Sequence, residues 1–144
     1  KAITQRLHSH RINVATLIHP SVSMSDFVQI GVGSIICAGA VITTNVTLGQ
    51  ASIVNPKCFI GHDTELDDFV SLMPSTNLAG EVKVGEGSYF GINSCVINRT
   101  IIGKWSIIGA GATVISDIPD YSVAVGVSAR VIKRRDMEDG AGAK

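Results

Sequence analysis

The sequence repeats with a period of six residues over most of its length. Every sixth position from Ile18 to Val114 carries a large apolar side chain, with no insertion or deletion in the series. The seventeen positions are Ile18, Met24, Ile30, Ile36, Ile42, Leu48, Val54, Ile60, Leu66, Leu72, Leu78, Val84, Phe90, Val96, Ile102, Ile108 and Val114. An ordinary β-sandwich does not keep a six-residue phase over such a distance, so the series predicts a stack of repeated units.

A second position of each hexad is restricted to smaller side chains. It lies four residues after the apolar position and holds Ser, Thr, Ala, Cys or Val at sixteen consecutive places from Val22 to Ala112. Because it lies two residues before the next apolar position, both side chains point to the same face of a strand. One outward residue lies between them, and the remaining residues of the hexad must turn; Gly, Asn and Asp at these places suit tight corners or positive backbone angles. Three strand-and-turn units then close a triangular coil of 18 residues, and the hexads form nearly six coils stacked at about 4.8 Å.

Composition excludes several classes of function. Lys plus Arg equals Asp plus Glu at 12 each, so no basic field favours nucleic acid or anionic lipid as a partner. No apolar run has the length of a membrane span, and no signal-peptide pattern opens the chain. Three cysteines in unrelated spacing suggest free thiols in a reducing compartment, so we expect a cytoplasmic protein. The chain begins at Lys1, which we interpret as the start of a fragment or a processed form.

One outward column of the predicted prism is apolar. Residues 18 apart lie above one another, and one column carries Ile35, Ile53, Ser71, Tyr89 and Ile107, of which all but Ser71 are large and largely apolar. Such a stripe predicts burial against another subunit, although scattered surface aliphatic residues are the alternative. We therefore expect a homo-oligomer packed through the Ile35/Ile53/Tyr89/Ile107 face.

The same columns place candidate catalytic groups at one corner. His62 occupies a turn position, Asp63 follows it, and Gly80 lies one coil above at about 4.8 Å backbone spacing. An imidazole beside a backbone N–H supplies the proton acceptor and the oxyanion donor that acyl transfer requires. Taken alone, His62 could equally be a solvated surface residue.

The other histidines give no indication of a metal site. His8, His10 and His19 lie outside the repeat or at its start, and no three histidines have the spacing of a metal centre. We expect no bound metal. Cys58 is predicted to point into the core, whereas Cys37 and Cys95 are predicted to point outward without an activating neighbour.

The chain resembles the hexapeptide-repeat acyltransferases, whose fold is a left-handed parallel β-helix, and the left-handed sense comes from this resemblance. Several strings are similar to the sialic-acid O-acetyltransferase family, which includes the bacterial UDP-4-amino-sugar N-acetyltransferases. They are the segments 15–20, 54–63, 78–80, 90–96 and 125–130. The similarity spans roughly residues 13 to 133 and covers the His-acid pair.

The resemblance implies an acetyl-CoA-dependent acetyltransferase acting on a nucleotide-linked amino sugar or a sialic-acid-type sugar. His62 is then the general base, Asp63 raises its basicity and fixes its tautomer, and Gly80 donates its amide to the oxyanion. The family often has Glu where this chain has Asp63. Acetyl-CoA contacts are implied for Ser71, Gly80, Ile92 and Ala110, and a position near the substrate for Asn55, which could instead be a turn residue with a left-handed backbone.

Ile92 and Ala110 are 18 residues apart, on a different corner from His62. One site can therefore use both corners only if two subunits contribute to it, and the family consists of trimers. We expect a homotrimer.

The resemblance also divides the chain. Residues 1–17 are expected to be a remnant of, or linker from, an N-terminal α/β sugar-binding domain, with mild helical character up to Arg11. Residues 18–119 form the β-helix, residues 120–135 cap its end, and residues 136–144 form a disordered tail.

Two other functions remain open from the sequence. The same His62 chemistry would serve O-acetylation of another small hydroxyl acceptor such as serine. A non-catalytic β-helix that acts as an oligomerisation scaffold is the third possibility.

Overall fold

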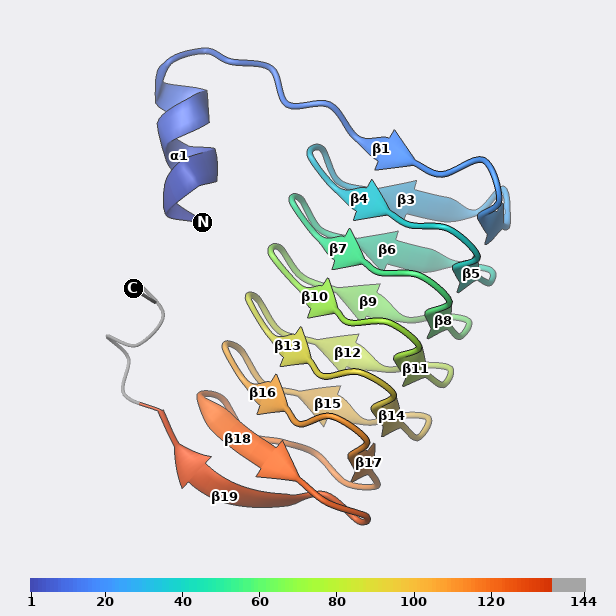
Figure 1. Ribbon diagram of the computed structural model, residues 1–144, viewed down its shortest axis with the longest axis vertical. Helices are drawn as coiled ribbons and strands as arrows, with labels where there is room; N and C mark the ends of the chain where they lie inside the picture. The colour runs from blue at the N-terminus through green and yellow to red at the C-terminus, as the bar shows by residue number, and fades with distance from the viewer. Residues whose placement is uncertain (136–144) are drawn as a thin grey trace.

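The computed structural model describes residues 1–135 as a left-handed parallel β-helix preceded by one short helix (Figure 1). The disordered tail that the sequence predicts at residues 136–144 lies outside the described part of the chain. Three sheets form the sides of the prism, and we call them sheets A, B and C. Sheet A contains β1 (Leu17–Ile18), β4 (Ile35–Ile36), β7 (Ile53–Val54), β10 (Ser71–Leu72), β13 (Tyr89–Phe90), β16 (Ile107–Ile108), β18 (Ser122–Val125) and β19 (Arg130–Arg134).

The other two sheets have the same construction. Sheet B contains β2 (Ser23–Met24), β5 (Val41–Ile42), β8 (Phe59–Ile60), β11 (Asn77–Leu78), β14 (Cys95–Val96) and β17 (Thr113–Val114). Sheet C contains β3 (Val28–Ile30), β6 (Val46–Leu48), β9 (Glu65–Leu66), β12 (Lys83–Val84) and β15 (Ile101–Ile102). From β1 to β17 all pairs are parallel and in an 18-residue register, as in Ile35 opposite Ile53, which confirms the predicted coil.

The inward column of apolar side chains is the core. From Ile36 onward every predicted apolar position of the repeat is buried. From Ser34 onward the smaller inward residues are buried too, and several of their hydroxyls bond the backbone of the neighbouring coil. Ser88 Oγ, for example, donates to Gly103 O at 2.7 Å and accepts from Ser106 N at 3.1 Å. No buried side-chain N or O atom in residues 1–135 lacks a hydrogen-bond partner.

Two features of the backbone form the corners of the coils. One turn position per hexad has positive φ whatever its residue type, and even Trp105 (φ 54°) and Phe69 (φ 62°) adopt it. The glycine that directly follows the apolar residue serves a different purpose. A Cβ on Gly61 would lie 2.5 Å from Ala79 C, so only glycine allows the next coil to approach this closely.

The two ends of the stack differ. β19 folds back antiparallel onto β18, which in turn pairs with β16 at the C-terminal end (Figure 1). At the N-terminal end, Ile18 and Met24 point inward but remain 44% and 41% exposed, because no coil precedes them. The helix α1 (Ala2–Ser9) lies beside the prism, and Lys1 pairs with Glu86 at 2.7 Å.

Candidate functional site

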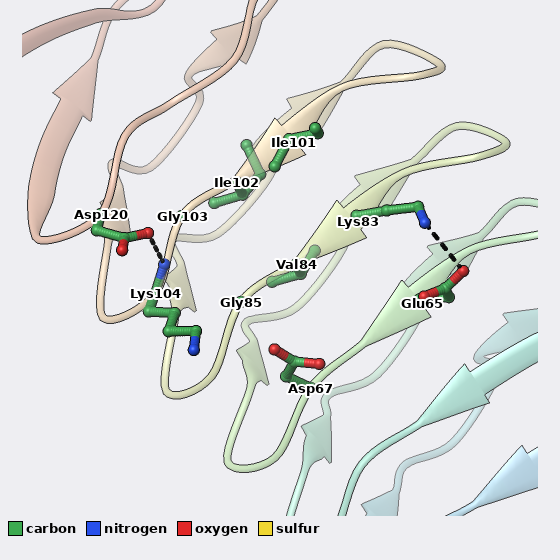
Figure 2. Close-up of a pocket in the computed structure, with 10 residues that line it drawn as sticks. All are labelled: Glu65, Asp67, Lys83, Val84, Gly85, Ile101, Ile102, Gly103, Lys104 and Asp120. Atoms are coloured by element: carbon green, nitrogen blue, oxygen red, sulfur yellow. Dashed lines mark hydrogen bonds and ion pairs between the residues drawn. The ribbon is translucent and has the colours of Figure 1, made fainter.

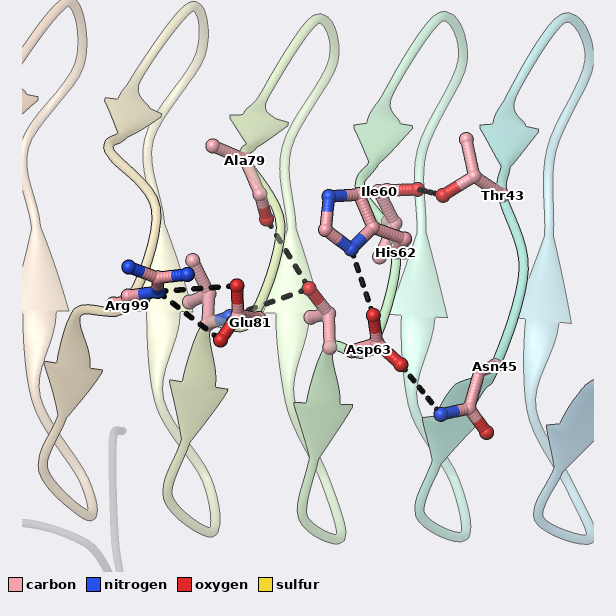
Figure 3. A network of polar contacts seen from close by, with 10 residues as sticks. Thr43, Asn45, Ile60, His62, Asp63, Ala79, Glu81 and Arg99 are labelled. Carbon is pink, nitrogen blue, oxygen red and sulfur yellow. Dashed lines mark hydrogen bonds and ion pairs between the residues drawn. The ribbon is translucent and has the colours of Figure 1, made fainter.

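The predicted general base lies at the corner between sheets B and C. His62 and Asp63 form the turn between β8 and β9 (Figure 3). Gly80 occupies the equivalent turn one coil further on. The His62 and Asp63 side chains are 57% and 47% exposed, so both are accessible to a substrate. The coils are held together here by Glu81 N, which donates to His62 O at 2.7 Å.

A chain of two hydrogen bonds runs through the Asp63 carboxylate. His62 Nδ1 lies 2.7 Å from Asp63 Oδ2, and Asn45 Nδ2 donates to Asp63 Oδ1 at 2.6 Å (Figure 3). Hydrogen bonds from Asn45 and then from His62 hold the pKa of Asp63 below its ordinary value of 3.8. Asp63 is therefore ionised at neutral pH and can only accept. Nδ1 of His62 is therefore the donor of this hydrogen bond, and in the neutral imidazole Nε2 is the nitrogen with a free lone pair.

The free nitrogen of His62 lies against Gly80. A Cβ placed on Gly80 would meet Nε2 of His62 at 2.5 Å and Cε1 at 2.6 Å, so the ring rests on the glycine backbone. Among residues 1–135 no acceptor binds the Gly80 N–H, although its carbonyl accepts from Arg99 N. The His62 ring and the Gly80 backbone are thus neighbours in successive coils. That Nε2 is the proton acceptor and the Gly80 N–H the oxyanion donor stays a prediction.

The remaining predicted residues gather at the corner between sheets A and B. Ile92 and Ala110 are both exposed in stacked turns at this corner, as predicted, and Ser71 points outward from β10 of sheet A. Sheet B therefore separates this group from His62 within one subunit.

Asn55 has a defined structural partner. Its Nδ2 donates to Leu72 O at 2.8 Å, which ties its turn to the next coil. Its φ is not positive, so the alternative of a left-handed turn residue is wrong. A substrate contact through Asn55 stays a prediction.

A groove of about 240 Å³ lies elsewhere, on the outer face of sheet C (Figure 2). Charged side chains that already have partners line part of it. Lys83 pairs with Glu65 at 3.3 Å, and Lys104 N donates to Asp120 Oδ1 at 2.8 Å. None of the predicted site residues contributes to the groove, so it does not add to the argument for acyl transfer.

Metal ligands do not cluster in residues 1–135: no three His, Cys, Asp or Glu side chains there could hold an ion. Within the same range no helix is long and apolar enough to cross a membrane.

Known proteins that are similar in sequence to this chain include several acetyltransferases. GDP-perosamine N-acetyltransferase of Escherichia coli O157:H7 is 31% identical over 109 residues, which cover 76% of this chain and 49% of that protein. A probable acetyltransferase of Mycobacterium tuberculosis is 30% identical over 95 residues, which cover 65% of this chain and 32% of that protein. This chain thus spans about half the length of the first relative and less of the second. No protein-family model matches the chain.

Solved structures of acetyltransferases also resemble this chain. A variant of perosamine N-acetyltransferase from Caulobacter crescentus, in complex with CoA and GDP-perosamine, superposes with a TM-score of 0.90 at 32% identity. The match covers 92% of this chain and 63% of that one. The chain is similar in sequence and in fold to hexapeptide-repeat sugar acetyltransferases. The acetyltransferase domain of PglB from Neisseria gonorrhoeae, in complex with acetyl coenzyme A, superposes with a TM-score of 0.88 at 34% identity over 91% of this chain and 64% of that one.

Asn45 is the polar partner that sequence reasoning missed. It lies 18 residues before Asp63, so the coil period that placed Gly80 over His62 could also have placed Asn45 beside Asp63.

Proposed function

We propose that this chain is the β-helix of an acetyl-CoA-dependent acetyltransferase that acylates the amine of a nucleotide-linked amino sugar. The observation that carries the proposal is the packing of the His62 ring, with Nε2 and Cε1, on the Gly80 backbone, together with the hydrogen bond between Nδ1 and Asp63. The relatives named above support the choice of substrates, since their structures contain CoA with GDP-perosamine, or acetyl coenzyme A.

His62 acts as the general base in this reaction. The neutral amine of the sugar attacks the thioester carbonyl, a C–N bond forms, and Nε2 of His62 takes the amine proton. The ionised Asp63 stabilises the resulting imidazolium through Nδ1. The Gly80 N–H donates to the oxyanion of the tetrahedral intermediate. Collapse breaks the C–S bond, and the departing thiolate of CoA takes the proton back from His62.

We further propose a homotrimer in which the site forms between subunits. His62 and the Ile92/Ala110 corner lie on opposite sides of sheet B, so a neighbouring subunit must supply the second group. The apolar stripe on sheet A is the surface through which the subunits would pack: Ile35, Ile53 and Tyr89 are 39%, 37% and 40% exposed. The three unpaired cysteines agree with a cytoplasmic location, where reducing conditions prevail.

A thiol-release assay with acetyl-CoA tests the activity. The acceptor panel contains GDP-perosamine, a UDP-4-amino sugar, sialic acid and serine, so that nitrogen and oxygen acceptors compete. We expect release with an amino sugar, and a loss of about 10²–10⁴-fold in kcat/KM for His62→Ala. His19→Ala is the matched control, because His19 is exposed and bonds only Ser21. Equal rates for the two variants would refute the assignment.

A further inference from the structure

We propose that Asn45 is a positioning residue of the acyl-transfer site and acts on His62 through the carboxylate of Asp63. The inference rests on the proposed function, because positioning matters only if His62 is the base. Asn45 lies in the turn between β5 and β6, one coil before His62 and on the same corner (Figure 3).

Asn45 and His62 form hydrogen bonds to different oxygens of the Asp63 carboxylate. Asn45 Nδ2 is 2.6 Å from Oδ1 of Asp63, and His62 Nδ1 is 2.7 Å from Oδ2. An exposed carboxylate that is held at one oxygen turns about its terminal bond. Holding the second oxygen fixes the plane of the carboxylate, and with it the direction in which His62 must point.

A second pair on this corner has a similar construction. Glu81 occupies the same turn position one coil after Asp63, so two like charges lie in adjacent coils. Arg99 Nε binds both oxygens of Glu81 at 3.1 Å and draws that side chain towards the next coil. Asn45 holds Asp63 from the preceding coil, so the partners of the two carboxylates lie on opposite sides along the stack (Figure 3).

The backbone of Asn45 suits this task. Its φ is 56°, and Asn is one of the few side chains that enter the left-handed region readily. Asp63 has φ 57°, so donor and acceptor leave equivalent turns of successive coils in the same conformation. Glycine also accepts this φ, so an Asn45→Gly change removes the amide without straining the turn.

Asn45 is also the largest cause of the lowered pKa of Asp63, ahead of His62 itself. A neutral amide can stabilise the carboxylate without competing with the imidazole as a counter-charge. Asp63 therefore stays ionised and accepting, which keeps the proton of His62 on Nδ1 and leaves Nε2 facing Gly80.

The first test is steady-state kinetics with acetyl-CoA and GDP-perosamine, or whichever amino sugar of the panel supports turnover. Losing one hydrogen bond to a carboxylate predicts a three- to tenfold fall in kcat for Asn45→Gly, with KM for acetyl-CoA unchanged. The loss should vanish in an Asp63→Gly background, because Asn45 acts only through that carboxylate. Ala51→Gly is the control, since it places glycine at the same turn position (φ 50°) of another corner.

The second test needs no turnover. Nitrogen–hydrogen correlation spectra of the imidazoles report the tautomer, and the His62→Ala variant identifies the His62 signals. We expect the Nδ1–H form in the parent chain and a mixture of tautomers in Asn45→Gly. An unchanged tautomer, an unchanged kcat, or a loss that persists in the Asp63→Gly background overturns the role of Asn45. If His62→Ala retains full activity while the tautomer responds to Asn45, the proposed function fails and the contact survives.

Discussion

Gly80→Ala is the sharpest test of how the two coils build the site. The added methyl carbon would lie 2.5 Å from Nε2 of His62, 2.6 Å from Cε1 and 2.9 Å from Cδ2. Ordinary contact begins near 3.4 Å, so the ring must move by roughly 1 Å. Because the His62 side chain is 57% exposed, it can move outward without disturbing the core.

A misplacement of about 1 Å in a reacting group costs on the order of 10²-fold in rate, or about 2.7 kcal/mol of barrier. We therefore expect kcat/KM for acetyl-CoA to fall by about that factor in Gly80→Ala, with the melting temperature nearly unchanged, because the φ of Gly80 is not positive.

Gly61→Ala is the contrasting variant from the preceding coil. Its Cβ would meet the backbone of Ala79 and Gly80 at 2.5 and 2.6 Å, and backbone cannot turn away. We expect it to lower the free energy of unfolding by about 1–3 kcal/mol. Thermal denaturation and kinetics on both variants distinguish a loss of activity from a loss of stability. Parent-like kcat/KM in Gly80→Ala, or destabilisation equal to that of Gly61→Ala, would refute the packing of His62 on Gly80.

Three further outcomes are expected. Ile53→Glu on the apolar stripe should yield monomers by light scattering while Ile101→Glu on sheet C does not, and a trimer in both would remove the interface from sheet A. The pKa of Asp63 is lowered on folding, so its ionised form stabilises the protein above its unfolded pKa and loses that effect as the pH falls through the folded value. The melting temperature of Asp63→Asn should therefore lie below that of the parent at pH 7 and approach it towards pH 2; a gap independent of pH would contradict this. Ser88→Ala leaves Gly103 O and Ser106 N without their buried partner and should cost about 1–3 kcal/mol in urea unfolding, whereas Ser23→Ala on the exposed surface should cost almost nothing.

The strict hexad made the fold predictable, because its phase fixes both the inward face and the coil length. It also placed Gly80 next to His62 correctly. The exposure of Ile18 and Met24 could not be predicted from the repeat, since an inward side chain is fully covered only if coils lie on both sides of it, and none precedes the first coil. Asn45 was missed because a turn asparagine is common: the 18-residue period places it one coil before Asp63, but only the structure shows that its side chain points to that carboxylate.

The role of the glycines also could not be fully predicted from the sequence. From the sequence, glycine after the apolar residue suits either a tight corner or a positive backbone angle. In the structure Gly61 does not have a positive φ, and its lack of a side chain allows the next coil to approach closely. The positive φ lies two residues later, where it is imposed on Asp63 and Trp105 alike. Coil geometry rather than residue type decides that conformation, so composition alone could not locate it.

The coil period also limits how such a gene can change length. An insertion of six residues after Val70 would keep every apolar side chain of the core inward, yet it would turn all later residues by one side of the prism. Pro74 would then take the place of Gly80 above His62, and proline has no N–H to donate. An insertion of eighteen residues would restore the side but put a new residue above His62. Folding thus tolerates duplications of one hexad, whereas the pairing of His62 with Gly80 tolerates none between them.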